Sequence, residues 1–249
     1  MLKVKNSARL PLKDFIGKGS YQERIEHAKK LNAQFYTLLQ SKAQDGLVLK
    51  SDFANLLKKV LPPNIDILLS TYVKKFLGNE GAYVLPLTDE HDEVVERMAL
   101  RIPTRKLFDN TRVFDKRDAN VIMHETFHLF ASLANPKLVA RITFTQKEVK
   151  FYNGYIYTNM HSKFGIRDRF NWKKGIKEFL GRKNLETQIN FLQNCRYRLL
   201  EEKLAYAEGD KYGNPNSMNK FFYFEEKIKI IEKMLYKTLK KVRKENKKA

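Results

Sequence analysis

Three side chains that can bind a metal or transfer a proton lie close together in the sequence, near the middle of the 249-residue chain. They are His124, Glu125 and His128. In a helix, residues four apart point from the same face, so the two imidazoles can reach one point. Two imidazole nitrogens at this spacing are typical ligands of one zinc ion, and the carboxylate beside them can act as a general base toward a water molecule. The spacing therefore predicts a metal-binding helix.

The element that must carry these residues is the run 119–134, which is apolar at most positions. A helix that is apolar on nearly every side is normally buried, and burying imidazoles and a carboxylate without partners is costly. Asp118 is a good N-cap, and Asn135 followed by Pro136 stops a helix. These signals predict a buried helix independently of the motif, and a bound metal would satisfy its polar groups.

A catalytic zinc usually takes three protein ligands, so one more must come from elsewhere in the chain. Glu202 is the leading candidate, because on a helix over 185–209 it shares an apolar stripe that should face the core. The other members of that stripe are Leu192, Cys195, Leu199 and Tyr206. The alternatives are Glu201 and Glu208, which fall on a polar face of the same helix, and His161 in an expected loop.

The segments 124–128 (His-Glu-Thr-Phe-His) and 202–205 (Glu-Lys-Leu-Ala) together resemble the pattern of gluzincin-type zinc metalloproteases, over roughly residues 80–210. The resemblance implies His124, His128 and Glu202 as zinc ligands and Glu125 as the base. Many gluzincins have an acidic residue directly after the Ala, where it orients a ligand histidine. This chain has Tyr206 there, so either Glu201 or Glu208 takes that part or the site is built differently.

The implied activity is hydrolysis of peptide bonds in a protein or peptide substrate, with Glu125 moving the proton. The negative charge that develops on the substrate needs one further hydrogen-bond donor. The side chains that could supply it are Tyr155, Tyr157, His161 and Tyr206, and the sequence does not choose among them.

The net charge of +20 is large for this length. It indicates attraction to a nucleic acid, to an anionic membrane or to an acidic substrate or partner, or simple solubility. The expected C-terminal helix over 218–246 interleaves aromatic and basic residues, but its apolar residues recur at helical spacing and should form a core, with the basic residues on a solvated face. A rival hypothesis is a nucleic-acid-associated or virion structural protein whose metal site is structural or inactive.

Cys195 is the only cysteine, which favours a reducing, cytoplasmic compartment, and its place on an apolar stripe predicts a packed core residue. The first residues lack the apolar region of a signal peptide, and no apolar run is long enough to span a bilayer. We expect a soluble protein, which could also be packaged in a virion or exported by a route without a signal. The sequence does not indicate an oligomeric state.

The remaining patterns predict a mainly helical α+β protein with an N-terminal helical module over 1–79, and the resemblance implies a zincin-like catalytic domain over 80–249. A small sheet should precede the metal-binding helix. Periodicity predicts helices over 21–39, 50–60 (capped by Ser51), 65–76, 185–209 and 218–246, and strands over 82–87, 94–102, 140–145 and 149–157.

Overall fold

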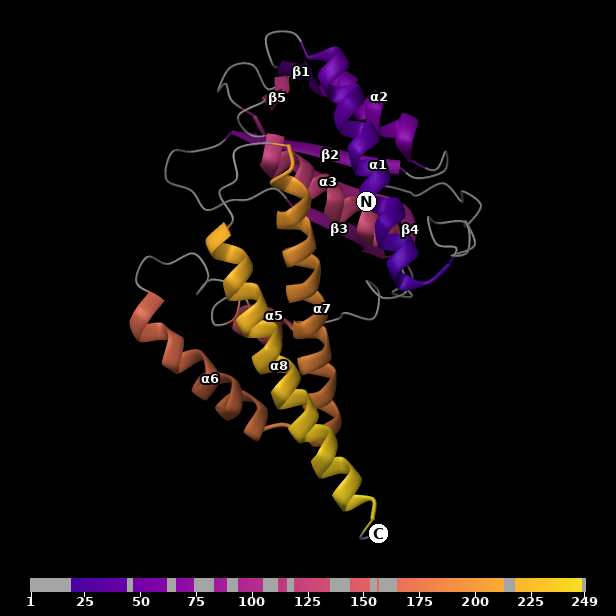
Figure 1. Cartoon of the computed structure of the whole chain (residues 1–249). Helices are drawn as coiled ribbons and strands as arrows, with labels where there is room; N and C mark the ends of the chain where they lie inside the picture. Colours follow the sequence, from indigo (N-terminus) through magenta and orange to yellow (C-terminus); the bar gives the residue numbers. More distant parts are fainter. Residues whose placement is uncertain are drawn as a thin grey trace. The chain divides into compact units, whose positions relative to one another are not determined.

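The computed structural model describes residues 19–43, 47–61, 66–73, 83–88, 94–104, 112–115, 119–134, 144–152, 156, 165–212 and 218–247. The protein is mainly helical, and the described part contains seven α-helices (Figure 1). It forms two compact units, Met1–Arg141 with Ala205–Asn216 and Ile142–Leu204 with Ser217–Ala249. These units are defined by packing. The predicted module over 1–79 and catalytic domain over 80–249 stay predictions.

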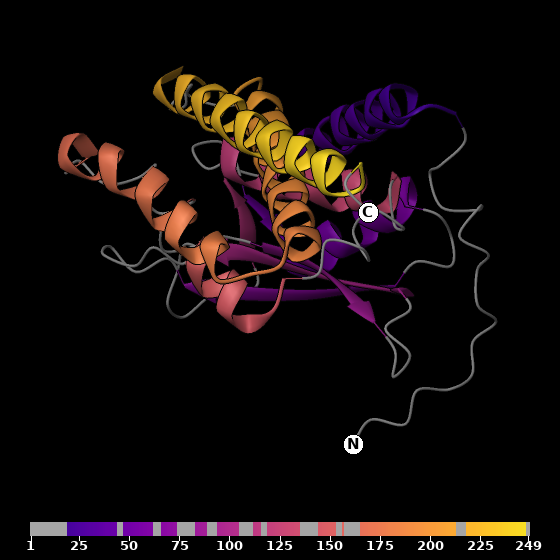
Figure 2. The same ribbon diagram turned by 90° about the horizontal axis from the view of Figure 1, so that it is seen from below.

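The first unit contains all the described strands and three complete helices. Its elements are α1 (Tyr21–Lys42), β1 (Leu47–Leu49), α2 (Lys50–Val60), β2 (Asp66–Val73), β3 (Tyr83–Thr88), β4 (Val94–Thr104), β5 (Arg112–Asp115) and α3 (Ala119–Ala134). Strand β4 lies at the centre of a three-stranded sheet, parallel to β2 and antiparallel to β3, and β1 pairs antiparallel with β5. Helix α3 packs against α1 and against β3 and β4, so it lies between a helix and a sheet (Figures 1 and 2).

Helix α1 is specified at its start and along its buried face. Ser20 Oγ accepts from the backbone N–H of Glu23, whose carboxylate accepts in return from the N–H of Ser20, a capping box. The buried side chain of Phe35 meets Phe53 of α2 edge to face, with ring centroids 5.1 Å apart, and Phe130 of α3 at 6.4 Å. These three rings join α1, α2 and α3 in one core.

The described part of the second unit contains four helices. They are α5 (Gln146–Phe151), α6 (Gly165–Gly181), α7 (Leu185–Gly209), which continues into the first unit from Ala205, and α8 (Met218–Glu245). Two ion pairs show that α7 and α8 run antiparallel, Arg196 with Glu232 and Lys203 with Glu225, each with an N–O distance of 2.7 Å.

Most of the predicted elements are confirmed. These are the helices over 21–39, 50–60, 119–134, 185–209 and 218–246 and the strands over 82–87 and 94–102. Cys195 is buried, as predicted for a core residue. On α8, Phe224, Ile228 and Ile231 are buried and confirm the expected core face, whereas Leu239 further along is 37% exposed. Asp118, Asn135, Pro136 and residues 140–143, on which the predicted cap, helix stop and strand start depend, lie outside the described residues.

The predicted helix over 65–76 is wrong, because residues 66–73 form strand β2. A short apolar run cannot be assigned to helix or strand by periodicity alone. The run ends in the β-branched and aromatic residues Thr71, Tyr72 and Val73, and all of β2 pairs with β4 over Arg97–Thr104. Pairing with a segment far along the chain therefore decided the conformation.

Two further predictions are wrong. Ser51 does not cap α2, whose N-cap is Leu49 without a side-chain hydrogen bond. The predicted strand over 149–157 begins inside helix α5, which has a capping box of Thr145 and Glu148. The Thr-x-x-Glu pattern could have indicated this helix. Helix α6 and strands β1 and β5 were not predicted at all.

None of the described helices has an apolar stretch long enough to cross a membrane. The predicted solubility and cytoplasmic location stay predictions.

Lys227 of α8 is a buried cation in the core of the second unit. Its ammonium donates a hydrogen bond to the backbone carbonyl of Ile156, and its side chain is 5% exposed. Burial lowers the pKa of Lys227 from 10.5 to about 8, against the opposing effect of the nearby Glu226 carboxylate. The folded protein therefore binds fewer protons at this site than the unfolded chain between about pH 8 and pH 10.5.

We therefore expect the free energy of unfolding to rise with pH in that window, by about 2–3 kcal/mol from this group. The neutral amine can still donate to Ile156, so deprotonation relieves the cost of burial without removing the hydrogen bond. Urea unfolding of wild type and Lys227→Met at pH 7.5, 9 and 10 isolates the effect. Wild type should gain stability relative to the variant, and a constant difference would contradict the shifted pKa.

Candidate metal centre

The helix that carries the histidine pair is buried along nearly all its length. His124 and Glu125 are each 8% exposed, and Thr126 is fully buried. The apolar residues next to these polar groups in the helix are also buried, as the sequence predicted. They are Ile122, Met123, Phe127, Leu129 and Phe130. The helix therefore holds a carboxylate and an imidazole in a largely apolar environment, where each needs a polar partner.

Helix α1 holds α3 in place through a buried amide. The side chain of Asn32 donates to the backbone carbonyl of Met123 over 3.1 Å and accepts from the hydroxyl of Thr126 over 2.7 Å. These bonds fix the residues on either side of the His124–Glu125 pair. Asn32 was missed from the sequence, although it interrupts the apolar 3-4-3-4 stripe of α1, where a polar residue needs a partner.

The two histidines face each other across one helical turn. Their Nε2 atoms are 3.2 Å apart, and their ring planes lie at 76°. Two nitrogens bound to one tetrahedral zinc at about 2.0–2.1 Å would be separated by about 3.3 Å. The observed separation therefore suits two ligands of one ion.

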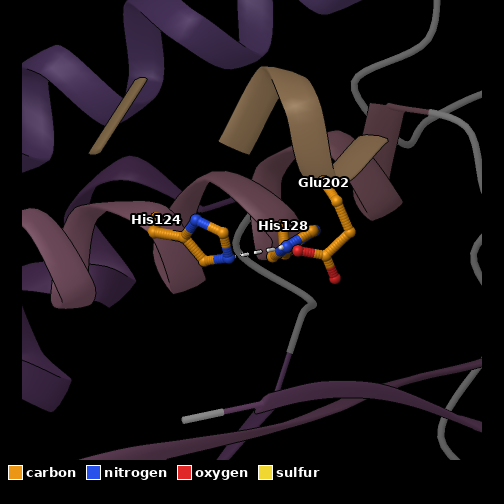
Figure 3. A group of neighbouring side chains, drawn as sticks. All are labelled: His124, His128 and Glu202. Carbon is orange, nitrogen blue, oxygen red and sulfur yellow. Dashed lines mark hydrogen bonds between the residues drawn. The ribbon is translucent and has the colours of Figure 1, made fainter. Parts of the chain in front are cut away.

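Glu202 meets the histidine pair, as Figure 3 shows. One ligand atom from each of His124, His128 and Glu202 lies within 4.8 Å of the others. Tetrahedral zinc brings its ligand atoms closer together than that upper limit, to about 3.3 Å. These three residues form a group that could hold a metal ion, as the sequence predicted.

The C-terminal turns of α7 lie directly on α3. The ring of Tyr206 packs against the imidazole of His124, with centroids 4.4 Å apart. At Gly209, an added Cβ would come within 2.5 Å of the carbonyl oxygen of Asn120. Glu202 precedes Tyr206 by four residues and Gly209 by seven, so all three share one helical face. This face opposes Asn120, His124 and His128, and the close approach at Gly209 explains how Glu202 reaches the pair.

The side chain of Glu125 lies at the edge of this group. Its Oε1 atom is 3.9 Å from Nε2 of His124, the nitrogen that also faces His128. The carboxylate is thus close to the point where the ligand atoms converge without being a member of the group. That position suits a group that moves a proton next to a metal.

The acidic alternatives to Glu202 are placed differently. Glu208 is buried, and its carboxylate accepts a hydrogen bond from Lys211. Glu201 is half-buried. Neither belongs to the group of described residues that could hold a metal ion. The position where gluzincins have an acidic residue is used here for ring packing, by Tyr206 against His124.

Of the four donor candidates, Tyr206 is the one that the structure describes and brings to the site. Tyr155, Tyr157 and His161 lie outside the described residues. A tyrosine that the sequence did not indicate, Tyr152, is buried in the second unit. Burial raises the pKa of Tyr152 well above its usual value, and the negative charge of Glu202 raises it further, which puts this phenol within electrostatic reach of the expected ligand.

Gly209 offers a sharp test of the packing between α7 and α3. We expect Gly209→Ala to destabilise the protein by about 1–3 kcal/mol, because the new methyl group would overlap a backbone carbonyl of a buried helix. It should also weaken metal binding, since the displaced helix carries Glu202. Thermal unfolding and metal titration would measure both effects.

Gly181→Ala is the matched control, because an added Cβ there has no described atom within 4 Å. It should leave stability and metal affinity within the range of ordinary surface changes. Equal behaviour of the two variants would contradict the close approach at Gly209.

The chain matches no family model, no curated protein and no solved structure. Of the resemblance to gluzincins, the structure supports the grouping of His124, His128 and Glu202. The identity of the ion and any activity are therefore matters for a proposal.

Proposed function

We propose that the protein is a zinc-dependent endopeptidase in which His124, His128 and Glu202 hold the metal and Glu125 is the general base. The convergence of Glu202 on the histidine pair is the observation that carries this proposal. Chance would rarely bring a carboxylate from a distant helix to a His-Glu-x-x-His pair. The proposal includes a zincin-like arrangement, in which the helix that carries the pair packs on β3 and β4.

The donor set suits a catalytic zinc. Structural zinc sites usually have four protein ligands, whereas catalytic sites have three and leave one position for water or substrate. Two imidazole nitrogens and one carboxylate make such a set of three, and magnesium or calcium would favour oxygen ligands throughout. Iron bound by two histidines and one carboxylate is the chemical competitor that metal analysis must separate from zinc.

The residues of the site have distinct parts in the proposed reaction. Zinc, when bound, supplies a Lewis acid that makes water more acidic and the substrate carbonyl more electrophilic. Glu125 accepts the proton of the attacking water and returns it to the leaving amine. Tyr206 holds the ring of His124 by packing against it. The net charge of +20 favours acidic protein or peptide substrates.

The decisive experiment combines metal analysis with a cleavage assay. Purified protein should contain about one zinc per chain and cleave members of a peptide library that includes acidic sequences. A chelator should abolish cleavage, and added zinc should restore it. Stoichiometric iron, or activity that persists without metal, would contradict the proposal. Bound zinc with no cleavage across the library would instead favour a structural site.

A further inference from the structure

The positive charge of the protein is concentrated in one of its two units. The second unit holds 24 Lys and Arg against 10 Asp and Glu, a net charge of +14. The first unit has 24 against 18, a net charge of +6, although it contains more residues. Most of the excess charge therefore lies outside the unit that carries the histidine pair.

Within the second unit, lysines line one face of α8. Lys233, Lys237, Lys240 and Lys244 follow one another in steps of four, three and four residues, and all four are exposed. This spacing keeps them on one narrow face of a helix, and we call them the lysine stripe. It is about 17 Å long at 1.5 Å per residue. Among the described residues, no ion pair engages any of the four.

The acidic residues next to the stripe do not compensate its charge, and the opposite face of α8 is packed in the core. Glu232, just before the stripe, is paired with Arg196 of α7. Glu245 is the one acidic residue between 233 and 247 in the sequence, and its position falls about a third of a turn from the stripe. The other face of α8 is occupied, since Ile231 and Thr238 are buried. An amphipathic helix that inserts into a membrane needs a free apolar face, which α8 does not offer.

An exposed aromatic ring lies at the border of the stripe. Tyr236 is 65% exposed, the most exposed of the large hydrophobic side chains described. Tyr236 precedes Lys240 of the stripe by one helical turn. Both residues belong to the C-terminal half of α8, whose last turns run past the start of α7 (Figure 1). Open aromatic rings next to lysines are the elements that bind single-stranded nucleic acids, where bases stack on the rings and phosphates meet the cations.

We propose that the lysine stripe binds the phosphodiester backbone of a nucleic acid, with Tyr236 stacking on an unpaired base when the strand is single. A regular row of cations complements a regular row of phosphates, and the stripe spans the axial length of about five nucleotides of one strand. Stacking on a base gives the exposed ring a role that binding to an acidic peptide or a lipid headgroup does not require. This binding is independent of the metal and of the proposed hydrolysis.

The test compares variants of the full chain with equal loss of charge. Lys237, Lys240 and Lys244 are changed together to Gln, and the control changes Lys30, Lys58 and Lys59, which are exposed in the first unit, to Gln. Binding to a labelled single-stranded RNA and a labelled DNA duplex is measured by fluorescence anisotropy over a range of salt. The stripe variant should lose about tenfold or more in affinity, with a log–log salt slope shallower by about 2 to 3 units.

The control variant should keep most of the affinity and most of the salt slope. Lys→Arg at the same three stripe positions should retain binding because the charge is kept. Tyr236→Ala should weaken binding to the single strand by about tenfold and leave the duplex unaffected. Thermal unfolding checks that each variant folds. Glu202→Ala should bind nucleic acid as wild type does, which separates this proposal from the proposed hydrolysis.

Two results would overturn the proposal. One is equal affinity and equal salt slope in the stripe variant and the charge-matched control, which would mean that net charge alone attracts nucleic acid. The other is stripe-dependent binding to phosphatidylserine vesicles without stripe-dependent binding to either nucleic acid.

Discussion

Glu125→Gln is expected to retain the metal and to lower peptide hydrolysis by about two to four orders of magnitude. The amide keeps the size of the carboxylate and cannot accept the proton of the attacking water. Because Oε1 of Glu125 is 3.9 Å from Nε2 of His124 and Glu125 does not belong to the group that could hold a metal ion, its loss should not release the ion. Initial rates of cleavage at saturating zinc, together with zinc content, would measure both quantities.

Glu201→Gln is the matched control, since Glu201 precedes a proposed ligand and lies outside the ligand group. It should leave the rate of cleavage nearly unchanged. Cleavage by Glu125→Gln at the wild-type rate would show that another group is the base. Loss of the metal in that variant would instead make Glu125 part of the coordination itself.

Glu202→Ala is expected to weaken zinc binding by more than about 100-fold, because it removes one of three protein ligands, and changes outside the ligand set alone cost about 10–100-fold. The effect should also appear as lost stabilisation. Zinc at about 1,000 times the wild-type Kd should stabilise the wild-type protein by about 4 kcal/mol, and a 100-fold weaker site should gain only about 1.4 kcal/mol at the same concentration.

Glu201→Ala again serves as the neighbouring control and should keep the full stabilisation by zinc. Thermal unfolding with and without zinc measures how much zinc stabilises each variant, even where the variants differ in stability without metal. If Glu202→Ala does not fold, Glu202→Gln keeps the shape of the side chain and should still lose affinity. Unchanged zinc stabilisation in both Glu202 variants would remove this residue from the site.

The two experiments together separate the proposed peptidase from its rivals. If metal binding requires Glu202 and peptide hydrolysis requires Glu125, the two results support the peptidase. Metal that depends on Glu202 without hydrolysis would leave a structural site in a protein whose main role lies elsewhere, for example at the lysine stripe. Since that stripe lies on α8 and the proposed ligands lie on α3 and α7, we expect that mutations can remove either proposed activity without the other.

The grouping of His124, His128 and Glu202 could be predicted from local patterns. Spacing placed His124 and His128 on one face of a helix, and the apolar run around them predicted burial, which the structure confirms for α3. The apolar stripe of α7 distinguished Glu202 from Glu201, because helical periodicity sorts neighbouring residues onto different faces. Helices with clear periodicity were predicted well because their hydrogen bonds are local.

Other features depended on contacts between distant segments. Strand β2 becomes a strand by pairing with β4, and the same short apolar run would suit a helix. The buried bonds of Asn32 need α3 beside α1, and the role of Gly209 appears only where α7 meets Asn120. Composition predicted a basic protein, but the paired and buried neighbours on α8 decide which lysines stay free for a partner. Periodicity reports which face of an element is apolar, whereas the element that covers that face follows from packing of the whole chain.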